Sequence, residues 1–220
     1  RVLFRSLNAI RAGVLGSNDG ILTVVGVLFS VAAATTNNFA IFIAGLADLM
    51  ACALSMASGE YASVSSQSDS EKVVVAQEEA LLKSDFSGQH LTVENFYVDR
   101  GVTRSTAKAI ADELLTKKPL ETMLSIKYDI KLGHYMNPWS AAWASLFSAA
   151  IGGVFPLAAL ILSPARYQFI ATIAATAVAV ALTGLLSAKL SNGLVKRAVI
   201  RNIIIGLLTI AIHYGIGKLF

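Results

Sequence analysis

Three acidic residues of this sequence stand inside or beside long apolar stretches, where an ionised side chain is costly. Asp19 lies in a Gly-Ser-Asn-Asp-Gly motif within the apolar run Ala12–Thr36. Asp48 is the single charge in a second apolar run, Phe39–Gly59, and Glu60 follows that run directly. A carboxylate at the centre of a membrane costs roughly 2.5–3.5 kcal/mol on insertion scales, so such residues are functional candidates by default. We interpret Asp19 as lining a polar path for a cation; the alternative is a structural polar contact between helices.

A row of candidate metal ligands recurs every four residues along the second apolar run: Asp48, Cys52, Met56 and Glu60. At 3.6 residues per turn, these four side chains form one slowly drifting stripe on a helix. Carboxylates suit hard divalent ions, and sulfur ligands favour softer transition metals. The mixture predicts a path for Fe²⁺ or Mn²⁺, unless Cys52 and Met56 are ordinary packing residues. Asn18, beside Asp19, completes our six candidates for the path.

The same carboxylates could couple metal movement to proton movement. Burial favours the protonated form of a carboxyl group, and a nearby cation favours its charged form. A buried acid on a metal path can therefore exchange H⁺ for a divalent ion. This chemistry requires no permanent cofactor, because the metal is the substrate and the proton is the coupling ion.

The composition indicates a membrane protein. Hydrophobic residues make up 55% of the chain and charged residues only 15%, which differs clearly from ordinary soluble domains. The net charge of +4 is modest, and the basic residues cluster near the ends of apolar runs, so no nucleic-acid partner is expected. The single cysteine excludes a disulfide within the chain. We expect no enzyme, since no HExxH, clustered-histidine or plausible Ser/His/Asp pattern occurs.

The order of apolar and polar segments predicts an all-α membrane protein with five transmembrane helices. The expected spans are Ala12–Thr36, Phe39–Gly59, Pro138–Ala165, Tyr167–Ala188 and Ala198–Gly217. Residues 1–62 thus hold two transmembrane helices, residues 63–137 a polar insert, and residues 138–220 three more transmembrane helices.

The distribution of Lys and Arg predicts the orientation of the chain in the membrane. One side carries six basic residues and the other only two: Arg1, Arg5, Arg11, Lys189, Lys196 and Arg197 against Arg166 and Lys218. Because short cytoplasmic loops are enriched in Lys and Arg, the N-terminus and the insert are expected to be cytoplasmic.

The insert is expected to be a short helical bundle that docks on a partner copy or on the membrane domain, and it holds eleven of the 14 acidic residues. Residues 68–83 should continue the second span as a polar helix, and the segment 86–88 should break it. Thr92 and Thr103 resemble N-cap residues of two further helices. Pro119, at a first turn, should start a last helix that runs to about Lys131.

Several motifs resemble the vacuolar iron transporter family, and the resemblance covers nearly the whole chain. The first two are fairly specific together: residues 11–20, RAGVLGSNDG, and residues 55–61, SMASGEY. Weaker matches are SVSSQ at 63–67, GVFPL at 153–157, Arg201-Asn202, and YGIG at 214–217. The five-span order with an insert after the second span is also similar.

The resemblance implies a homodimer with a translocation path at its two-fold axis, lined by the first spans. It implies export of Fe²⁺, and often Mn²⁺, from the cytosol in exchange for protons. Asp19, Asp48 and Met56 match the pore positions of the family, and Glu60 lies at the cytoplasmic mouth. The membrane would be the plasma membrane in a bacterium, which we favour, or the vacuolar membrane in a eukaryote.

The resemblance also implies that the insert collects metal with glutamates and methionines. The candidate ligands there are Glu71, Glu78, Glu79, Glu121 and Met123. Leu124 and Lys127 stand where a methionine and a glutamate would be expected. Because lysines are interleaved with these acids, the alternative is a solvated helix face.

Two further interpretations stay open from the sequence. His90 and His134 are expected at the surface, whereas His213, late in the last span, could help protons to leave. The rival to a transporter is a non-transporting membrane scaffold or metal-responsive regulator that uses the helical insert to bind partners. Metal-dependent proton flux in liposomes would discriminate between the two functions.

Overall fold

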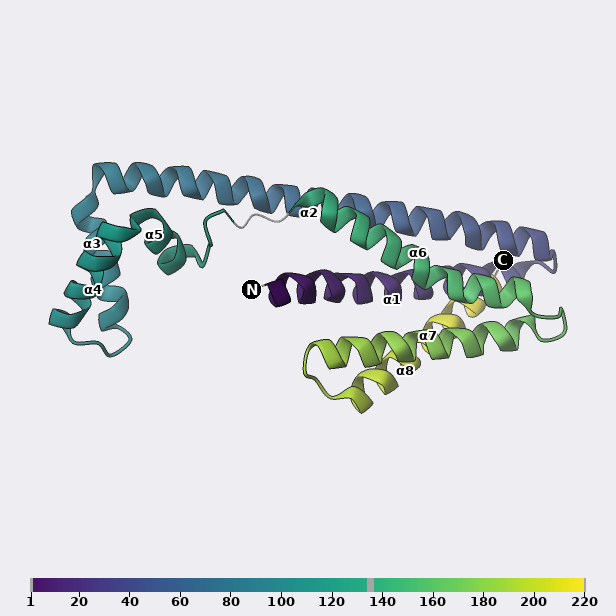
Figure 1. Ribbon diagram of the computed structural model, residues 1–220. Coiled ribbons are helices and arrows are strands. Elements are labelled where there is room, and N and C mark those ends of the chain that lie inside the picture. Colours follow the sequence, from purple (N-terminus) through teal and green to yellow (C-terminus); the bar gives the residue numbers. More distant parts are fainter. Residues whose placement is uncertain (1, 134–136, 220) are drawn as a thin grey trace. The chain divides into compact units, whose positions relative to one another are not determined.

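Every element of the described chain is an α-helix, as the sequence predicts (Figure 1). The structure, a computed structural model, describes residues 2–133 and 137–219, with side chains from residue 13 onward except at position 15. The expectations for Arg1 and His134 therefore fall outside the described residues. The chain divides into two units, which we describe separately: an apolar unit of residues 1–62 and 138–220, and the insert of residues 63–137.

Five helices among the described residues are long and apolar enough to cross a bilayer. They are α1 (Val2–Ala34), α2 (Asn38–Ser84), α6 (Pro138–Leu162), α7 (Gln168–Leu190) and α8 (Val195–Gly217). α6 ends before the predicted Ala165, because Pro164 disfavours helical backbone at the residue that precedes it. α2 continues far beyond its apolar part, to Ser84, as the predicted polar extension requires.

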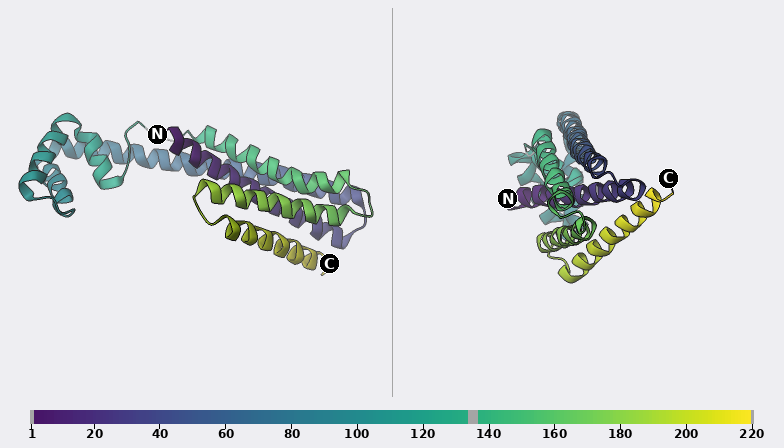
Figure 2. Two further views of the ribbon diagram at one scale, coloured as in Figure 1. Left: turned by 60° about the horizontal axis from the view of Figure 1, so that its bottom comes forward. Right: turned by 90° about the vertical axis from the view of Figure 1, so that its right-hand side faces the viewer.

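α1 lies at the centre of the apolar unit, between α6 on one side and α7 and α8 on the other (Figure 2). Val24 and Leu28 pack with α2 and α6 in one apolar cluster. Ile21 packs against Val180 of α7, and Val25 belongs to a cluster with α8. These α1 side chains are almost fully buried. The first span is therefore the core of the unit as well as the carrier of Asp19.

Glycines let α1 approach its neighbours closely. A Cβ at Gly20 would clash with the backbone of Ala149 on α6, and a Cβ at Gly152 would clash with the backbone of Ser17. A Cβ at Gly217 of α8 would likewise clash with the backbone of Ser30. Small residues that allow such contact are the common means of helix association in membranes, where the solvent is itself apolar. These seams fix the position of α1 against α6 and α8.

The insert contains the end of α2 and three short helices: α3 (Phe86–Val98), α4 (Arg104–Lys117) and α5 (Pro119–Tyr128). Val93, Ala111, Leu115 and Met123 form its small apolar core. As predicted, Thr103 precedes the first residue of α4, and Pro119 is the first residue of α5. The insert is thus a small bundle whose helices meet through few, fully buried side chains.

Three predicted helix boundaries in the insert are wrong. The break after α2 lies at Asp85 rather than at 86–88, because the Asp85 carboxylate accepts a hydrogen bond from the Gly88 amide and caps α3. Thr92 lies inside α3, where its hydroxyl donates to the carbonyl of Gly88 instead of capping a helix. α5 ends at Tyr128 and not near Lys131, because Asp129 adopts a left-handed conformation.

Candidate functional site

Asp48 of α2 is a half-buried acid that lies against α1. The hydroxyl of Thr23, on α1, lies close to the Asp48 carboxylate and to the Cys52 thiol, and it donates to the carbonyl of Gly20 at 3.5 Å. The second carboxylate oxygen, Oδ2, is buried and has no hydrogen-bond partner within the described part of the chain. A buried carboxylate oxygen without a donor is costly. Such an oxygen is, for the same reason, a ready ligand for a proton or a metal ion.

Asp19 belongs to the same neighbourhood but has a different environment. It lies one helical turn before Thr23 on α1. Its carboxylate, like that of Asp48, is close enough to the Cys52 thiol to interact with it electrostatically. Its side chain is exposed in the single chain. Because the flanking glycines, Gly16 and Gly20, face α6, Asp19 is turned away from that seam. The structure therefore brings Asp19, Asp48 and Cys52 to one side of the α1–α2 pair.

Met56 and Glu60 extend the stripe along α2. The methyl group of Met56 is 3.5 Å from the position of a Cβ at Gly16, so the end of its side chain reaches α1 about one turn before Asp19. Met56, Glu60 and Cys52 are all partly exposed in the single chain. From Asp48 to Glu60, at about 1.5 Å per residue, the stripe spans about 18 Å of helix. Carboxylate, hydroxyl, thiol and thioether groups thus line one continuous face.

Asn18, another path candidate, has its side chain bonded to α7 and α8. Its amide oxygen accepts a hydrogen bond from the Thr183 hydroxyl of α7 at 3.0 Å and one from the Asn202 amide of α8 at 3.5 Å. Asn202 also donates to the carbonyl of Val180. Asn18 therefore ties three helices together, about 100° around α1 from Asp19.

Thr23 is a polar residue of the site that the sequence did not single out, and the contacts of His213 were not expected from it. Thr23 could have been found, since it lies four residues after Asp19 and so shares its helix face. His213 of α8 packs its ring against Gly26, and its Nδ1 lies 3.2 Å from the Ser30 hydroxyl. That contact joins the last span to the first, and no local pattern indicates it.

The candidate ligands of the insert have partners within the insert itself. Glu71 accepts a hydrogen bond from Gln67, Glu79 pairs with Lys83, and Glu121 pairs with Lys118. Lys83 also lowers the pKa of Glu79, chiefly through its hydrogen bond and then through its charge. Glu78 pairs with Lys127, and Met123 is buried in the apolar core. Metal binding by these five residues stays a prediction.

The stripe on α1 and α2 is not a closed metal site within one chain. Among the described residues, no three His, Cys, Asp or Glu side chains converge closely enough to hold a metal ion. The acids are instead distributed along a polar face that is partly exposed. Such an arrangement offers a succession of weak contacts, which suits passage of an ion better than its storage.

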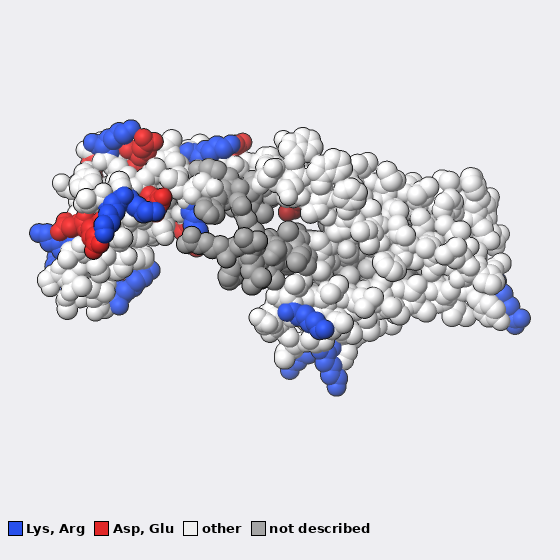
Figure 3. Space-filling model, viewed as in Figure 1, with Lys and Arg blue, Asp and Glu red and all other residues white. Residues whose placement is uncertain are grey.

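The surroundings of this face are those of a membrane protein. The visible Lys and Arg side chains of the apolar unit lie near the ends of its helices, and most of its visible surface is uncharged (Figure 3). α8 is the least buried of the candidate spans, with 11% of its apolar window buried. Large apolar side chains cover its outer surface, as lipid contact requires.

Comparison with known proteins confirms the family resemblance of the sequence motifs. The chain matches the family model described as "VIT family" over residues 10–218. It is 32% identical over 211 residues to the vacuolar iron transporter of Acanthamoeba castellanii, covering 96% of this chain and 78% of that protein.

Two plant proteins are also similar. Vacuolar iron transporter homolog 1 of Oryza sativa subsp. japonica is 32% identical over 212 residues, covering 96% of this chain and 73% of the relative. Vacuolar iron transporter homolog 2.1 of Arabidopsis thaliana is 25% identical over 210 residues, covering 95% and 80%. The family match and these relatives extend over both units and all five apolar helices, and the chain therefore belongs to the VIT family.

Proposed function

We propose that this protein carries Fe²⁺ or Mn²⁺ across a membrane along the polar face of α1 and α2, in exchange for protons. The relatives named vacuolar iron transporters support metal transport as the general function. The finer proposal depends on the Asp48 carboxylate, which lies close to Thr23 and whose Oδ2 is buried without a hydrogen-bond partner among the described residues. The proposed route starts near Glu60 and Met56, passes Cys52 and Asp48, and includes Asp19.

Dehydration of the metal ion explains why acids occupy this face. A divalent ion that enters a low-dielectric region loses water and needs replacement ligands of opposite charge. Asp48 and Asp19 supply carboxylate oxygens, and Met56 and Cys52 add sulfur ligands that favour transition metals over Mg²⁺. When the ion leaves, a proton can neutralise the vacated carboxylate, which provides the exchange.

A homodimer would complete the path. Asp19 is exposed in the single chain, although an acid that faces lipid at the bilayer centre costs roughly 2.5–3.5 kcal/mol or more. A second copy placed against this face would shield Asp19 from lipid and double the number of ligands at each level. We propose that the path lies between two copies, with metal entering from the cytosol at Glu60.

The proposal predicts that Asp48→Asn stops transport while the protein stays folded. The amide keeps the size of the side chain but cannot supply a negative charge or exchange a proton. In proteoliposomes that contain a Mn²⁺-sensitive dye and a pH dye, the Mn²⁺ and proton fluxes should fall at least tenfold, equivalent to about 1.4 kcal/mol of lost stabilisation.

The matched control is Asp69→Asn, which removes an exposed acid of the insert that pairs with Lys72. It should leave both fluxes unchanged. Equal, wild-type fluxes in the Asp48 and Asp69 variants would refute the assigned role of Asp48. Wild-type protein without any metal-dependent flux would instead support the rival function, a membrane scaffold or regulator that works through the insert.

A further inference from the structure

The insert contains a fully buried carboxylate whose counter-charge comes from the chain itself. Glu78 has 0% of its surface exposed. The ammonium group of Lys127 lies 2.8 Å from Glu78 Oε1 and also donates to Oε1 of Gln89, which is buried too. The hydroxyl of Tyr128 lies 3.5 Å from the other Glu78 oxygen. Oxygen atoms from α2 and α3 thus converge on one cation from α5.

This cluster has the chemistry of a cation site that is already filled. Carboxylate and amide oxygens are ligands that hard divalent ions prefer, and a buried carboxylate without a cation is strongly unfavourable. The Lys127 side chain, only 22% exposed, provides that cation at hydrogen-bonding distance. A divalent ion could reach Glu78 only by displacing the ammonium.

We propose that Lys127 is a built-in counter-ion that takes the place of a divalent metal at Glu78. The ammonium joins the end of α2 to α3 and α5, so the insert holds its fold without metal and takes up none at this position. This role concerns the insert alone and does not depend on whether the chain transports metal.

Hydrogen exchange of α3 and α5 in the full-length protein, with and without MnCl₂, tests the proposal. In the wild type, Mn²⁺ should not change the exchange rates of these helices. Lys127→Met should exchange faster without metal, because it leaves the Glu78 charge buried and unpaired, and Mn²⁺ should slow that exchange again. The double variant Glu78→Gln/Lys127→Met, which buries no charge, should be near wild type and insensitive to Mn²⁺.

The number of Mn²⁺ ions bound per chain gives a second measurement. The double variant should bind as many ions as the wild type, since Glu78 is not a ligand in either. A wild-type insert that Mn²⁺ protects, with the protection and one bound ion lost in the double variant, would overturn the proposal. The comparison of wild type and double variant decides the question even where Lys127→Met fails to fold.

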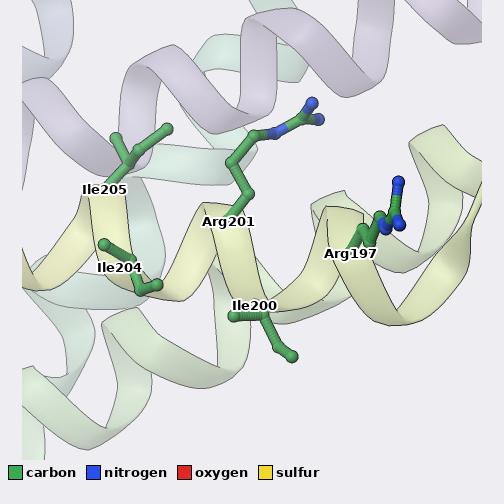
Figure 4. A pocket seen from close by; sticks show the side chains of 5 residues that line it. All are labelled: Arg197, Ile200, Arg201, Ile204 and Ile205. Carbon is green, nitrogen blue, oxygen red and sulfur yellow. The ribbon is translucent and has the colours of Figure 1, made fainter.

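A second inference concerns a groove on the outer face of α8. The groove has a volume of about 340 Å³ and is lined by Arg197, Ile200, Arg201, Ile204 and Ile205. The two arginines are one turn apart, and their guanidinium groups extend from the same side of the helix (Figure 4). The groove therefore combines two adjacent cations with an apolar floor.

Within the described part of the chain, neither arginine forms an ion pair with an acidic side chain. The segment 138–220 contains no Asp or Glu, and no ion pair with Arg197 or Arg201 occurs among the described residues. Lys189 and Lys196 add further positive charge in the region where α7 ends and α8 begins. Clusters of basic residues beside membrane helices attract anionic lipid headgroups.

We infer that this groove binds an anionic phospholipid. The phosphate would lie between Arg197 and Arg201, and one acyl chain would follow Ile204 and Ile205 along α8. Guanidinium groups suit phosphate because their planar donors match its oxygens.

Lipid retention tests this site. The protein is reconstituted in vesicles of phosphatidylcholine and phosphatidylglycerol, extracted in mild detergent and analysed by native mass spectrometry. Wild type should retain phosphatidylglycerol several-fold over its share in the vesicle, and Arg197→Gln/Arg201→Gln should lose this excess. The control Arg166→Gln/Lys218→Gln removes two charges near the opposite helix ends and should keep it. Equal retention by the three proteins would overturn the assignment. Complete displacement of the lipid by added inorganic phosphate would overturn it as well.

Discussion

Asn18 and Asp19 are adjacent on α1, but their side chains have different surroundings. Asp19 is exposed on the polar face, whereas the amide of Asn18, about 100° around the helix, bonds Thr183 and Asn202. The sequence motif suggested both as path residues because adjacent positions look alike in a linear pattern. Only the packing of α7 and α8 against α1 separates the ligand candidate from the structural residue.

Substitutions at these two positions should therefore affect different properties. Asp19→Asn should abolish metal flux in proteoliposomes and leave thermal stability and dimerisation unchanged. Asn18→Leu should lower the free energy of unfolding by about 0.5–2 kcal/mol, the range for hydrogen bonds between membrane helices. Full transport by the Asp19 variant would remove that residue from the path, and unchanged stability of the Asn18 variant would contradict its role in tying the helices.

Met56 carries the prediction about metal selectivity. Its thioether approaches Gly16, near Asp19, and sulfur ligands favour transition metals over Mg²⁺. Met56→Ala should therefore weaken competition by Fe²⁺ more than competition by Mg²⁺ in a transport assay. Met50→Ala, an exposed methionine on the same helix, is the control and should leave both unchanged. An equal loss for both ions in the Met56 variant would assign that side chain to packing.

At the level of elements, hydropathy was sufficient to predict the five apolar helices, because length and composition alone decide what crosses a bilayer. The caps inside the insert were harder. Thr92 and Thr103 have the same local signature, yet only Thr103 occupies an N-cap position, and its hydroxyl contacts that of Thr106 rather than a helix amide. The Thr92 hydroxyl instead bonds a carbonyl four residues earlier within α3. A hydroxyl near a helix can satisfy either kind of partner, so sequence alone does not distinguish a cap from an interior residue.

Tertiary contacts account for the rest of what the sequence left open. Helical periodicity could have identified Thr23, because it shares a face with Asp19. His213 and Lys127, in contrast, contact partners that are distant in the sequence. The acids of the insert illustrate the difficulty. Their spacing was compatible with a metal cluster or with a solvated face, and only the positions of Lys83, Lys118 and Lys127 reveal how each is paired.

The close contact between α1 and α6 leads to a prediction about stability. A Cβ at Gly20 would clash with the backbone of Ala149, whereas one at Gly59 would meet nothing within 4 Å. Gly20→Ala should destabilise the apolar unit by about 1–3 kcal/mol, since overpacking at a backbone contact forces the helices apart. Gly59→Ala should be neutral or slightly stabilising, because alanine favours helix more than glycine. Thermal unfolding in detergent measures both, and similar midpoints for the two variants would contradict the seam.

At the scale of the whole molecule, the exposed acid on α1 predicts self-association. A single chain would present Asp19 and the polar stripe of α2 to lipid, and a second copy would cover them. Light scattering in detergent should give a protein mass of about twice 23.2 kDa. A protein that transports metal as a monomer would show that the path is formed within one chain.

The hydrogen bonds that join Asn18 to Thr183 and Asn202 have a consequence for biosynthesis. The hydrogen-bond partners of Asn18 lie 165 and 184 residues further along the chain. At a synthesis rate of about 5–20 residues per second, the first span waits roughly 10–35 s before they leave the ribosome. During that interval the amide must be sheltered by the insertion machinery or by water at the interface. Nascent chains that terminate before the fourth span keep this group unsatisfied, which gives membrane quality control a feature by which to recognise them.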